Sequence, residues 1–243
     1  MDIVQPQRLP VVQSVVARGV VLGARLAVER LRDRRTYGAV LLAVALAITG
    51  GLIERSATSL GAVDRALGGT FRLVVPLLTL SLVSRAVSRD GLGPGTFSVA
   101  RFGVPRFAVA LGVTCGAALV CAGLGAVLAA LTVLAAHNPA APPLALDLLQ
   151  SAWIGAVTSL AYAAWTAFGS TYFRGRGRWM PIGADYLLGG STGFAAALLP
   201  RAHASSLLGI GEAPIDMPRA ASFGALFVMT ILLTLSAATR SGR

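Results

Sequence analysis

Six apolar stretches, each bounded by charged residues, glycine or proline, constrain the fold of this chain more than any other feature. They cover residues 38–53, 70–84, 107–136, 148–170, 182–199 and 220–238. A helix needs about 20 apolar residues to cross the hydrocarbon layer of a bilayer. The stretches are continuous rather than alternating, which disfavours membrane-spanning strands. We therefore expect an all-α integral membrane fold with six transmembrane helices.

The composition agrees with a membrane protein. Hydrophobic residues make up 55% of the 243 residues and charged residues only 13%, whereas a soluble domain carries about a quarter charged residues. The net charge is +11, which in a soluble domain would raise nucleic acid as a partner. Here the arginines flank apolar stretches instead of forming a basic face with interleaved aromatics. We therefore expect the lipid bilayer, and no nucleic acid, as a partner.

The arginines also predict an orientation. With six helices, sixteen of the 21 basic residues fall on the side of the two chain ends. Positively charged residues concentrate in the cytoplasmic segments of membrane proteins. We therefore expect both termini in the cytoplasm and the protein in a bacterial plasma membrane. The expected divisions are an interfacial helix within residues 1–36, the six-helix domain within 37–239, and a cytoplasmic tail within 240–243.

The segment before the first apolar stretch has amphipathic helical spacing. Its apolar positions are Val12, Val15, Val16, Val20, Leu22 and Leu26. Arg18, Arg25 and Arg32 are seven residues apart and form a stripe on the other side. Such a helix is expected to lie in the cytoplasmic membrane interface, with its arginines near lipid headgroups. Either it only anchors the chain, or it also contacts a cytoplasmic partner.

Motifs for enzymatic chemistry are weak. The sequence GGSTG at 189–193 matches the nucleophile-elbow pattern, but that motif needs a preceding strand, and Ser191 lies in an apolar stretch. His137 and His203 both fall in expected outer loops, away from it. We therefore predict no catalytic residues, metal or cofactor in this chain. Gly189 with Gly193, and Gly112 with Gly116, have the spacing that brings helices into close contact.

Three residues inside the apolar stretches, and one directly before the fourth stretch, are of interest. Asp185 is the one carboxylate within a span, and an intramembrane acid is by default a candidate functional residue. It either occupies a helix start near Arg178, where the helix dipole favours negative charge, or it lies on a substrate or proton path. Arg72 either snorkels to the interface or faces the same path. Pro76 predicts a kink, and Asp147 predicts an N-cap of the fourth span.

The loop at 88–107, SRDGLGPGTFSVARFGVPRF, separates two apolar stretches and holds three arginines, four glycines and two prolines. By the charge distribution it is cytoplasmic. A short helix at 96–103, with Pro94 and Pro105 as its boundaries, would move as a rigid unit, and its arginines can make charge-assisted contacts with a soluble partner. The segment 171–181 is a second, smaller candidate for such a contact.

Together, the span with Pro76 and this loop resemble the membrane permease subunits of ABC exporters of the second type. The matching positions are Pro76, Asp90, Gly95, Thr96, Pro105 and Arg106. The chain departs from the family pattern in having aspartate where glutamate is commoner, and extra glycine and proline before Gly95. The layout of six spans, a preceding interfacial helix and a longer outer loop before the last span also fits the family.

The resemblance implies a function. The chain would be the permease subunit of an ATP-driven exporter, forming its translocation path with a second permease subunit. A coupling loop with Asp90, Gly95, Thr96, Arg101, Pro105 and Arg106 would dock on a separate P-loop ATPase. Lysine is absent from the sequence, so this chain has no nucleotide-binding P-loop of its own and the partner would bind ATP. The alternative is a non-transporting membrane scaffold or assembly factor.

Overall fold

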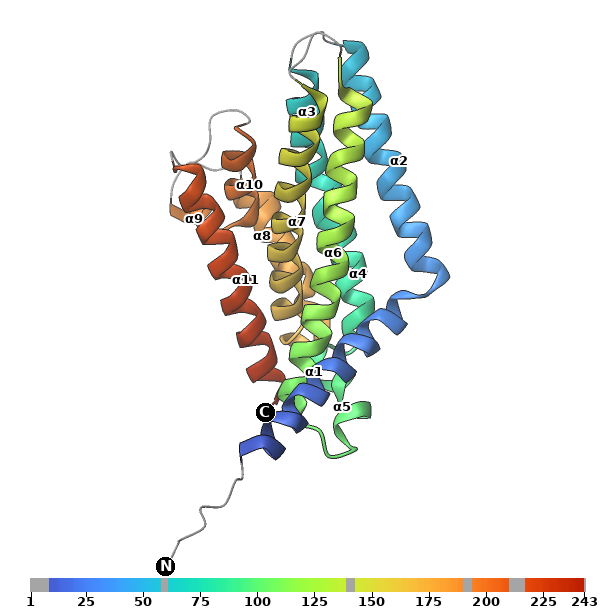
Figure 1. Ribbon diagram of the computed structural model, residues 1–243, viewed down its shortest axis with the longest axis vertical. Helices are drawn as coiled ribbons and strands as arrows, with labels where there is room; N and C mark the ends of the chain where they lie inside the picture. The colour runs from blue at the N-terminus through green and yellow to red at the C-terminus, as the bar shows by residue number, and fades with distance from the viewer. Residues whose placement is uncertain (1–8, 58–60, 139–142, 190–193, 210–216, 243) are drawn as a thin grey trace, which may run out of the picture.

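The computed structural model describes residues 9–57, 61–138, 143–189, 194–209 and 217–242, and within these ranges the chain is helical without strands. Figure 1 shows the helices packed around a common long axis. In chain order they are α1 (Leu9–Leu31), α2 (Arg34–Ala57), α3 (Ala62–Gly69), η1 (Thr70–Val74), α4 (Val75–Val87), α5 (Leu92–Ala100), α6 (Arg106–Ala136), α7 (Leu144–Gly169), η2 (Phe173–Trp179), α8 (Met180–Leu188), α9 (Phe194–Ala197), α10 (Pro200–Leu208) and α11 (Arg219–Gly242).

Five segments of the described chain are long and apolar enough to cross a membrane. They are Arg34–Ala57, Ala62–Ala100, Arg106–Ala136, Leu144–Gly169 and Arg219–Gly242. The second contains α3, η1 and α4, which form one helical run that ends at Val87. The multi-pass membrane character predicted from the sequence is thus supported by five helices.

A sixth continuous span at 182–199 is not confirmed. The chain there is divided between α8, which has nine residues, and α9, which has four. Nine residues at 1.5 Å each span about 14 Å, roughly half the thickness of the hydrocarbon layer. Residues 190–193, which include Ser191 and Gly193 of the GGSTG sequence, lie outside the described residues.

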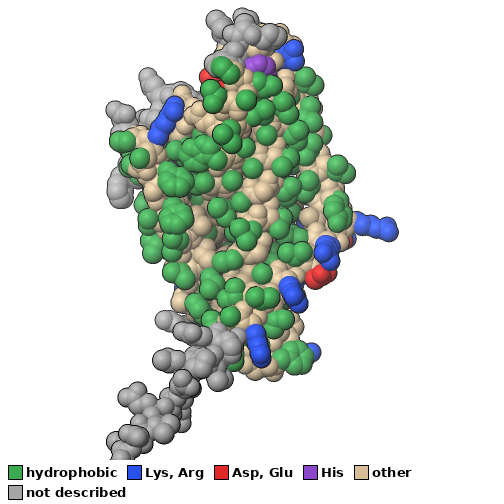
Figure 2. Space-filling view, viewed as in Figure 1, with side chains coloured by type: hydrophobic (Ala, Val, Ile, Leu, Met, Phe, Trp, Pro, Cys, Tyr) green, Lys and Arg blue, Asp and Glu red, His purple; other side chains and the backbone are tan. Residues whose placement is uncertain are grey.

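The two ends of the bundle differ in composition. In Figure 1 the beginning of α1, the whole of α5 and the end of α11 lie together at the lower end. We call this the arginine-rich end, because the turns and helix ends there carry Arg89, Arg101, Arg106, Arg174, Arg176, Arg178 and Arg240. Figure 2 shows hydrophobic side chains over the middle of one face, with arginine side chains mainly toward this end.

Small residues bring the central helices close together. A Cβ at Gly125 of α6 would lie 2.6 Å from the carbonyl oxygen of Gly155 in α7. A Cβ at Gly51 of α2 would lie 3.0 Å from the carbonyl oxygen of Thr132 in α6. Membrane helices gain packing energy where small side chains allow their backbones to approach. α6 is therefore the centre of the bundle, with α2 and α7 in contact with it.

α1 packs against α6 by the same means. A Cβ at Gly23 would overlap the carbonyl oxygen of Val109, and one at Gly112 would overlap that of Val20. Gly116 similarly faces Ala24 of α1. The predicted close packing at Gly112 and Gly116 is confirmed, and the partner helix is the N-terminal one. The location of α1 in the membrane interface stays a prediction.

The helical run through Pro76 contains a π-helical turn. Pro76 has no N–H to donate to the carbonyl four residues back, which is that of Arg72. The N–H of Val75 bonds instead to the carbonyl of Thr70, five residues back. An inserted wide turn of this kind is a common way for a helix to accommodate local strain. A π-helical turn, η1, thus directly precedes Pro76 and the helix continues through it, while the predicted kink stays a prediction.

The predicted N-cap role of Asp147 is wrong. α7 begins at Leu144, and Pro143, with a φ of −55° and a ψ of 120°, is its N-cap residue. Proline fixes φ near the helical value and so favours an earlier start. Asp147 lies instead in the first turn of α7, where its charge still interacts favourably with the helix dipole.

Candidate functional site at the arginine-rich end

The short helix predicted in the loop is present, but it begins earlier than expected. α5 covers Leu92–Ala100, so Pro94 lies in its first turn and does not bound it. Proline is tolerated in a first turn because the N–H groups there have no helical partner. After α5 the chain turns at Gly103, whose φ is +84°, and Pro105 directly precedes α6. Pro105 therefore marks the start of α6, whereas α5 ends at Ala100, three residues before the predicted end at 103.

The inner face of α5 rests on the end of α4. A Cβ at Gly95 would overlap the carbonyl oxygen of Val87. Thr96 is fully buried, and its hydroxyl donates a 2.8 Å hydrogen bond to the carbonyl of Gly93. Leu92 is also fully buried. Gly95 and Thr96, two of the residues matched by the resemblance, thus hold α5 in place and do not face outward.

The outer face of α5 and the turn after it carry two pairs of an arginine with an aromatic ring. The Arg101 guanidinium lies 5.0 Å from the ring centre of Phe102, and that of Arg106 lies 4.9 Å from Phe97. The rings are 74% exposed for Phe102 and 53% for Phe97. Exposed aromatic and arginine side chains are the residue types enriched in protein interfaces. Together with exposed Pro105, they form a surface that we call the α5 face.

Arg30 is a site residue that the sequence reasoning missed. Its guanidinium donates hydrogen bonds of 2.8 Å to the carbonyl of Ala86 in α4 and 2.7 Å to that of Gly95 in α5. Burial lowers the pKa of Arg30 from its ordinary value, yet arginine remains protonated at neutral pH. Arg30 therefore joins α1, α4 and α5. In the sequence, the sign that Arg30 has a separate role is that it lies outside the stripe formed by Arg18, Arg25 and Arg32.

Arg178 joins the two loops of this end. Its guanidinium donates to the carbonyls of Ser84 at 3.1 Å and Gly175 at 2.5 Å, and also to that of Arg89. Burial lowers its pKa and the charge of Asp90 opposes this shift. Cations are favourable at a helix C-terminus, where carbonyls lack helical partners. The loop at 88–91 and η2, which the sequence treated as separate candidates, thus form one surface.

Glycines allow this contact between the loops. Gly91 and Gly175 have φ values of +106° and +83°, in the region that favours glycine. A Cβ at Gly91 would lie 2.5 Å from the carbonyl oxygen of Ser170, and one at Gly175 would lie 2.7 Å from the Gly91 nitrogen. Both positions therefore require glycine for conformation and for space.

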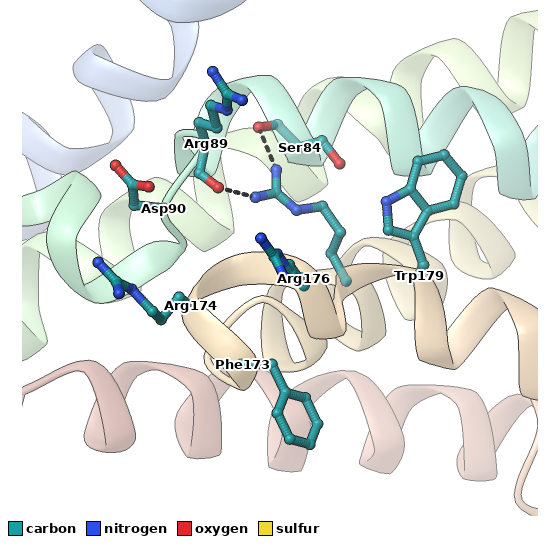
Figure 3. Close-up of a pocket in the computed structure, with 8 residues that line it drawn as sticks. Ser84, Arg89, Asp90, Phe173, Arg174, Arg176 and Trp179 are labelled. Carbon is teal, nitrogen blue, oxygen red and sulfur yellow. Dashed lines mark hydrogen bonds between the residues drawn. The ribbon is translucent and has the colours of Figure 1, made fainter.

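The joined loops enclose a cleft, which we call the η2 cleft. It has a volume of about 930 Å³. Figure 3 shows η2 supplying most of its side chains, with Arg174 and Arg176 near the loop that carries Arg89 and Asp90. Its lining residues are Ser84, Arg89, Asp90, Phe173, Arg174, Arg176, Arg178 and Trp179. A neighbouring cleft of about 640 Å³ shares Asp90 and Arg174 and also contains Arg106 and Arg240.

Asp185 lies away from this end and from its expected partner. It is 2% exposed and occupies the sixth position of α8, beyond the first turn. The Tyr162 hydroxyl donates a 2.6 Å hydrogen bond to one carboxylate oxygen, and the backbone N–H of Arg201 donates to the other at 3.2 Å. Its helix-terminus partner is therefore the start of α10. The predicted location at the start of α8 beside Arg178 is wrong.

Arg72 contacts the residue that follows Asp185. Its guanidinium lies 5.7 Å from the ring centre of Tyr186, within the range of a cation–π interaction. The two residues predicted to lie on a substrate path therefore belong to neighbouring elements, η1 and α8. Within the described residues, no group of three or more histidine, cysteine or acidic side chains has the arrangement of a metal site.

No protein-family model, curated protein or solved structure matches this chain.

Proposed function

We propose that the protein is the permease subunit of an ATP-driven exporter in a bacterial plasma membrane, with the arginine-rich end in the cytoplasm. The observation that supports this most directly is the way α5 is held. Its inner face is fixed by Gly95, Thr96 and Arg30, while Phe97, Arg101 and Phe102 on the outer side are exposed. A helix that is fixed on one side and open on the other is suited to receive a soluble partner.

A route leads from the α5 face into the bundle. Arg30 bonds α5 to α1 and to the end of α4. α1 in turn packs backbone to backbone against α6 along Gly23 and Gly112. Packed interiors respond to a push as discrete rearrangements, because they deform little. A displacement of α5 by an ATPase would therefore move α1 and the beginning of α6 with it.

The remaining parts of the proposal concern the partner chains and the path. The partners are a separate P-loop ATPase, which binds ATP, and a second permease subunit, identical or related. The substrate path passes the neighbourhood of Arg72 and Asp185, two charged residues at the depth where membrane proteins rarely place them without a function.

The proposal is tested by purifying the tagged protein from its own membranes in mild detergent and measuring bound ATPase. We expect a P-loop ATPase to co-purify and to hydrolyse ATP. Arg101→Glu should reduce its recovery about tenfold or more, because like charges at an interface cost several kcal/mol. The variant should insert normally, because exposed substitutions alter stability by only about 0.5 kcal/mol.

The matched control is Arg55→Glu, an exposed arginine at the end of α2 on the opposite side of the bundle. It should leave ATPase recovery unchanged. If no P-loop ATPase co-purifies with the unmodified protein, or if Arg101→Glu recovers as much ATPase as the control, the coupling role is lost. The scaffold function then becomes the better account of the α5 face.

A further inference from the structure

The η2 cleft has an unusual concentration of positive charge. η2 contains Arg174, Arg176 and Arg178 alternating with Gly175 and Gly177. Both glycines are buried against neighbouring backbone, which leaves the arginines on the open side. With Arg89, four arginines line the cleft and Asp90 is its single carboxylate. The cleft is therefore an electropositive cavity built on a tightly packed base.

The two exposed arginines of η2, Arg174 and Arg176, are not committed to the fold. Arg178 is fixed by its bonds to the loop carbonyls. Arg174 and Arg176 are exposed, and among the described residues no hydrogen bond or ion pair of either side chain is recorded. In Figure 3 the side chains of Arg174 and Arg176 both extend from η2 toward the loop that carries Arg89 and Asp90. Their mutual repulsion is lowered most effectively by an anion between them.

The backbone at the edge of the cleft is also strained. Phe173 and Arg174 have φ values of +50° and +54°. Side chains other than glycine and asparagine rarely adopt this region, and such conformations concentrate at ligand sites. The strained pair places Arg174 at the point that the η2 cleft shares with its neighbour. This observation is independent of the charge count and concerns the same residues.

The position of the cleft in the chain places it near the expected membrane surface. η2 begins four residues after the end of α7, a candidate span, and Ser84 of the cleft belongs to α4. Trp179 and Met180 at the start of α8 are 63% and 60% exposed. Tryptophan is enriched where membrane proteins meet the headgroup region. The cleft therefore opens toward the headgroup region, where lipid headgroups are the most abundant groups that could bind.

We propose that the η2 cleft binds the phosphate group of an anionic phospholipid from the adjacent leaflet. Arg174 and Arg176 contact the phosphate, since guanidinium groups bind phosphate oxygens with two parallel hydrogen bonds. Trp179 packs against the glycerol region. The cleft volume of about 930 Å³ is large enough for a lipid headgroup, and its position directly after α7 and beside exposed Trp179 favours lipid over the ATPase as the occupant. The inference does not depend on the exporter proposal.

Native mass spectrometry of the purified protein tests the site. The protein is exchanged into neutral detergent with phosphatidylglycerol or, separately, phosphatidylcholine. We expect phosphatidylglycerol to be retained and phosphatidylcholine to be lost at the same activation energy. The double variant Arg174→Asn and Arg176→Gln should weaken retention about tenfold or more. Asparagine is chosen at position 174 because it tolerates a positive φ.

The control variant, Arg34→Gln with Arg55→Gln, removes two exposed positive charges outside the cleft and should retain phosphatidylglycerol as the unmodified protein does. Equal retention of the two lipids, or unchanged retention in the cleft variant, would overturn the proposal. Displacement of the lipid by millimolar glycerol 3-phosphate would assign the cleft to a soluble phosphate ester instead. Loss of a co-purifying protein with lipid retention unchanged would assign it to a protein partner.

The single variant Arg176→Gln controls for a folding defect in the double variant. It leaves the strained residues untouched and should still lower retention, while the size-exclusion profile stays that of the unmodified protein. A normal profile with undiminished lipid binding in this variant would also count against the proposal.

Discussion

The Arg30 guanidinium donates a 2.7 Å hydrogen bond to the carbonyl oxygen of Gly95, although 65 residues separate the two positions in the sequence. The same guanidinium reaches the carbonyl of Ala86. α5 is therefore not an independent loop helix. It is bonded to the N-terminal helix and to the end of α4, so that the three elements meet at one side chain.

Arg30→Ala should release α5. The change leaves the Ala86 and Gly95 carbonyls without this partner and should cost about 1.5–3 kcal/mol, the range for hydrogen bonds to charged groups. Hydrogen exchange should accelerate over residues 92–100. Arg25→Ala, at an exposed position of the same helix, should leave exchange in α5 unchanged. Equal exchange in the two variants would mean that Arg30 does not hold α5.

Gly95→Ala should have the same effect by a steric route. The new Cβ would overlap the Val87 carbonyl oxygen, whereas a Cβ at Gly93 meets nothing nearer than 3.9 Å. Gly93→Ala is therefore a control in the same helix, with the same gain in helix propensity. We expect faster hydrogen exchange in α5 for Gly95→Ala only. Similar protection in both variants would contradict the docked position of α5.

The sequence predicted this region in part. The presence of a helix in the loop and the start of α6 after Pro105 could be predicted, because proline and glycine constrain the backbone locally. The beginning of α5 was misplaced because Pro94 is compatible with a first turn as well as with a boundary. The contacts of Arg30 and Arg178 are made to backbone carbonyls, and any arginine can make them. Only the folded structure shows that Arg30 and Arg178 are the arginines that make these contacts.

The division of the segment 182–199 illustrates a second limit. Hydropathy averages over a window, so it reports apolar content without reporting a break in the helix. Here α8 ends at Leu188 and Gly189 follows it, closely packed against Arg201 of α10. In the same way, the sequence pattern predicted that Asp185 lies at the start of a helix near Arg178. Its true partners, Tyr162 and the N–H of Arg201, come from elements whose contact depends on that break.

Gly23→Leu should detach α1 from α6. The added side chain would overlap the Val109 carbonyl oxygen, whereas a side chain at Gly38 in α2 meets no atom within 4 Å. Overpacking of a close contact costs about 1–3 kcal/mol or more. The melting temperature in detergent should fall for Gly23→Leu and stay unchanged for Gly38→Leu. An unchanged melting temperature for Gly23→Leu would mean that the α1–α6 contact does not stabilise the fold.

The proposed cytoplasmic location of the arginine-rich end is tested by cysteine labelling in intact cells. Ser98 is exposed on α5, and Ser56 is exposed at the far end of α2. A membrane-impermeant maleimide should label Ser56→Cys and spare Ser98→Cys until the cells are opened. The native Cys115 and Cys121 lie within α6, so the unmodified protein gives the background. The reverse pattern would invert the orientation expected from the arginine distribution.

Tyr162→Phe should destabilise the protein more than Tyr186→Phe. Tyr162 is fully buried and its hydroxyl bonds to buried Asp185, whereas Tyr186 is 52% exposed. Removing one partner of a buried charged group costs about 1–3 kcal/mol or more, so thermal unfolding in detergent should separate the two variants. Equal stability would show that the Tyr162–Asp185 bond contributes little to the fold.

Asp185→Asn distinguishes the structural role of Asp185 from a role on a substrate path. Asparagine keeps an oxygen that can accept from Tyr162 or from the Arg201 N–H, but it removes the charge. If Asp185 only ties α7 to the start of α10, the variant should lose a modest part of its stability and keep function in proportion to its folded amount. If the charge acts on substrate or protons, function should fall by tenfold or more in protein that remains folded, since about 1.4 kcal/mol of lost interaction is a factor of ten. Growth complementation normalised to folded protein in the membrane measures this difference.

Tyr162→Phe is the control, because it retains the Asp185 carboxylate and removes only the hydrogen bond that Tyr162 donates to it. Its function should therefore fall only in proportion to the amount of folded protein, whichever role Asp185 has. A loss of function confined to Asp185→Asn would identify the charge as the active feature.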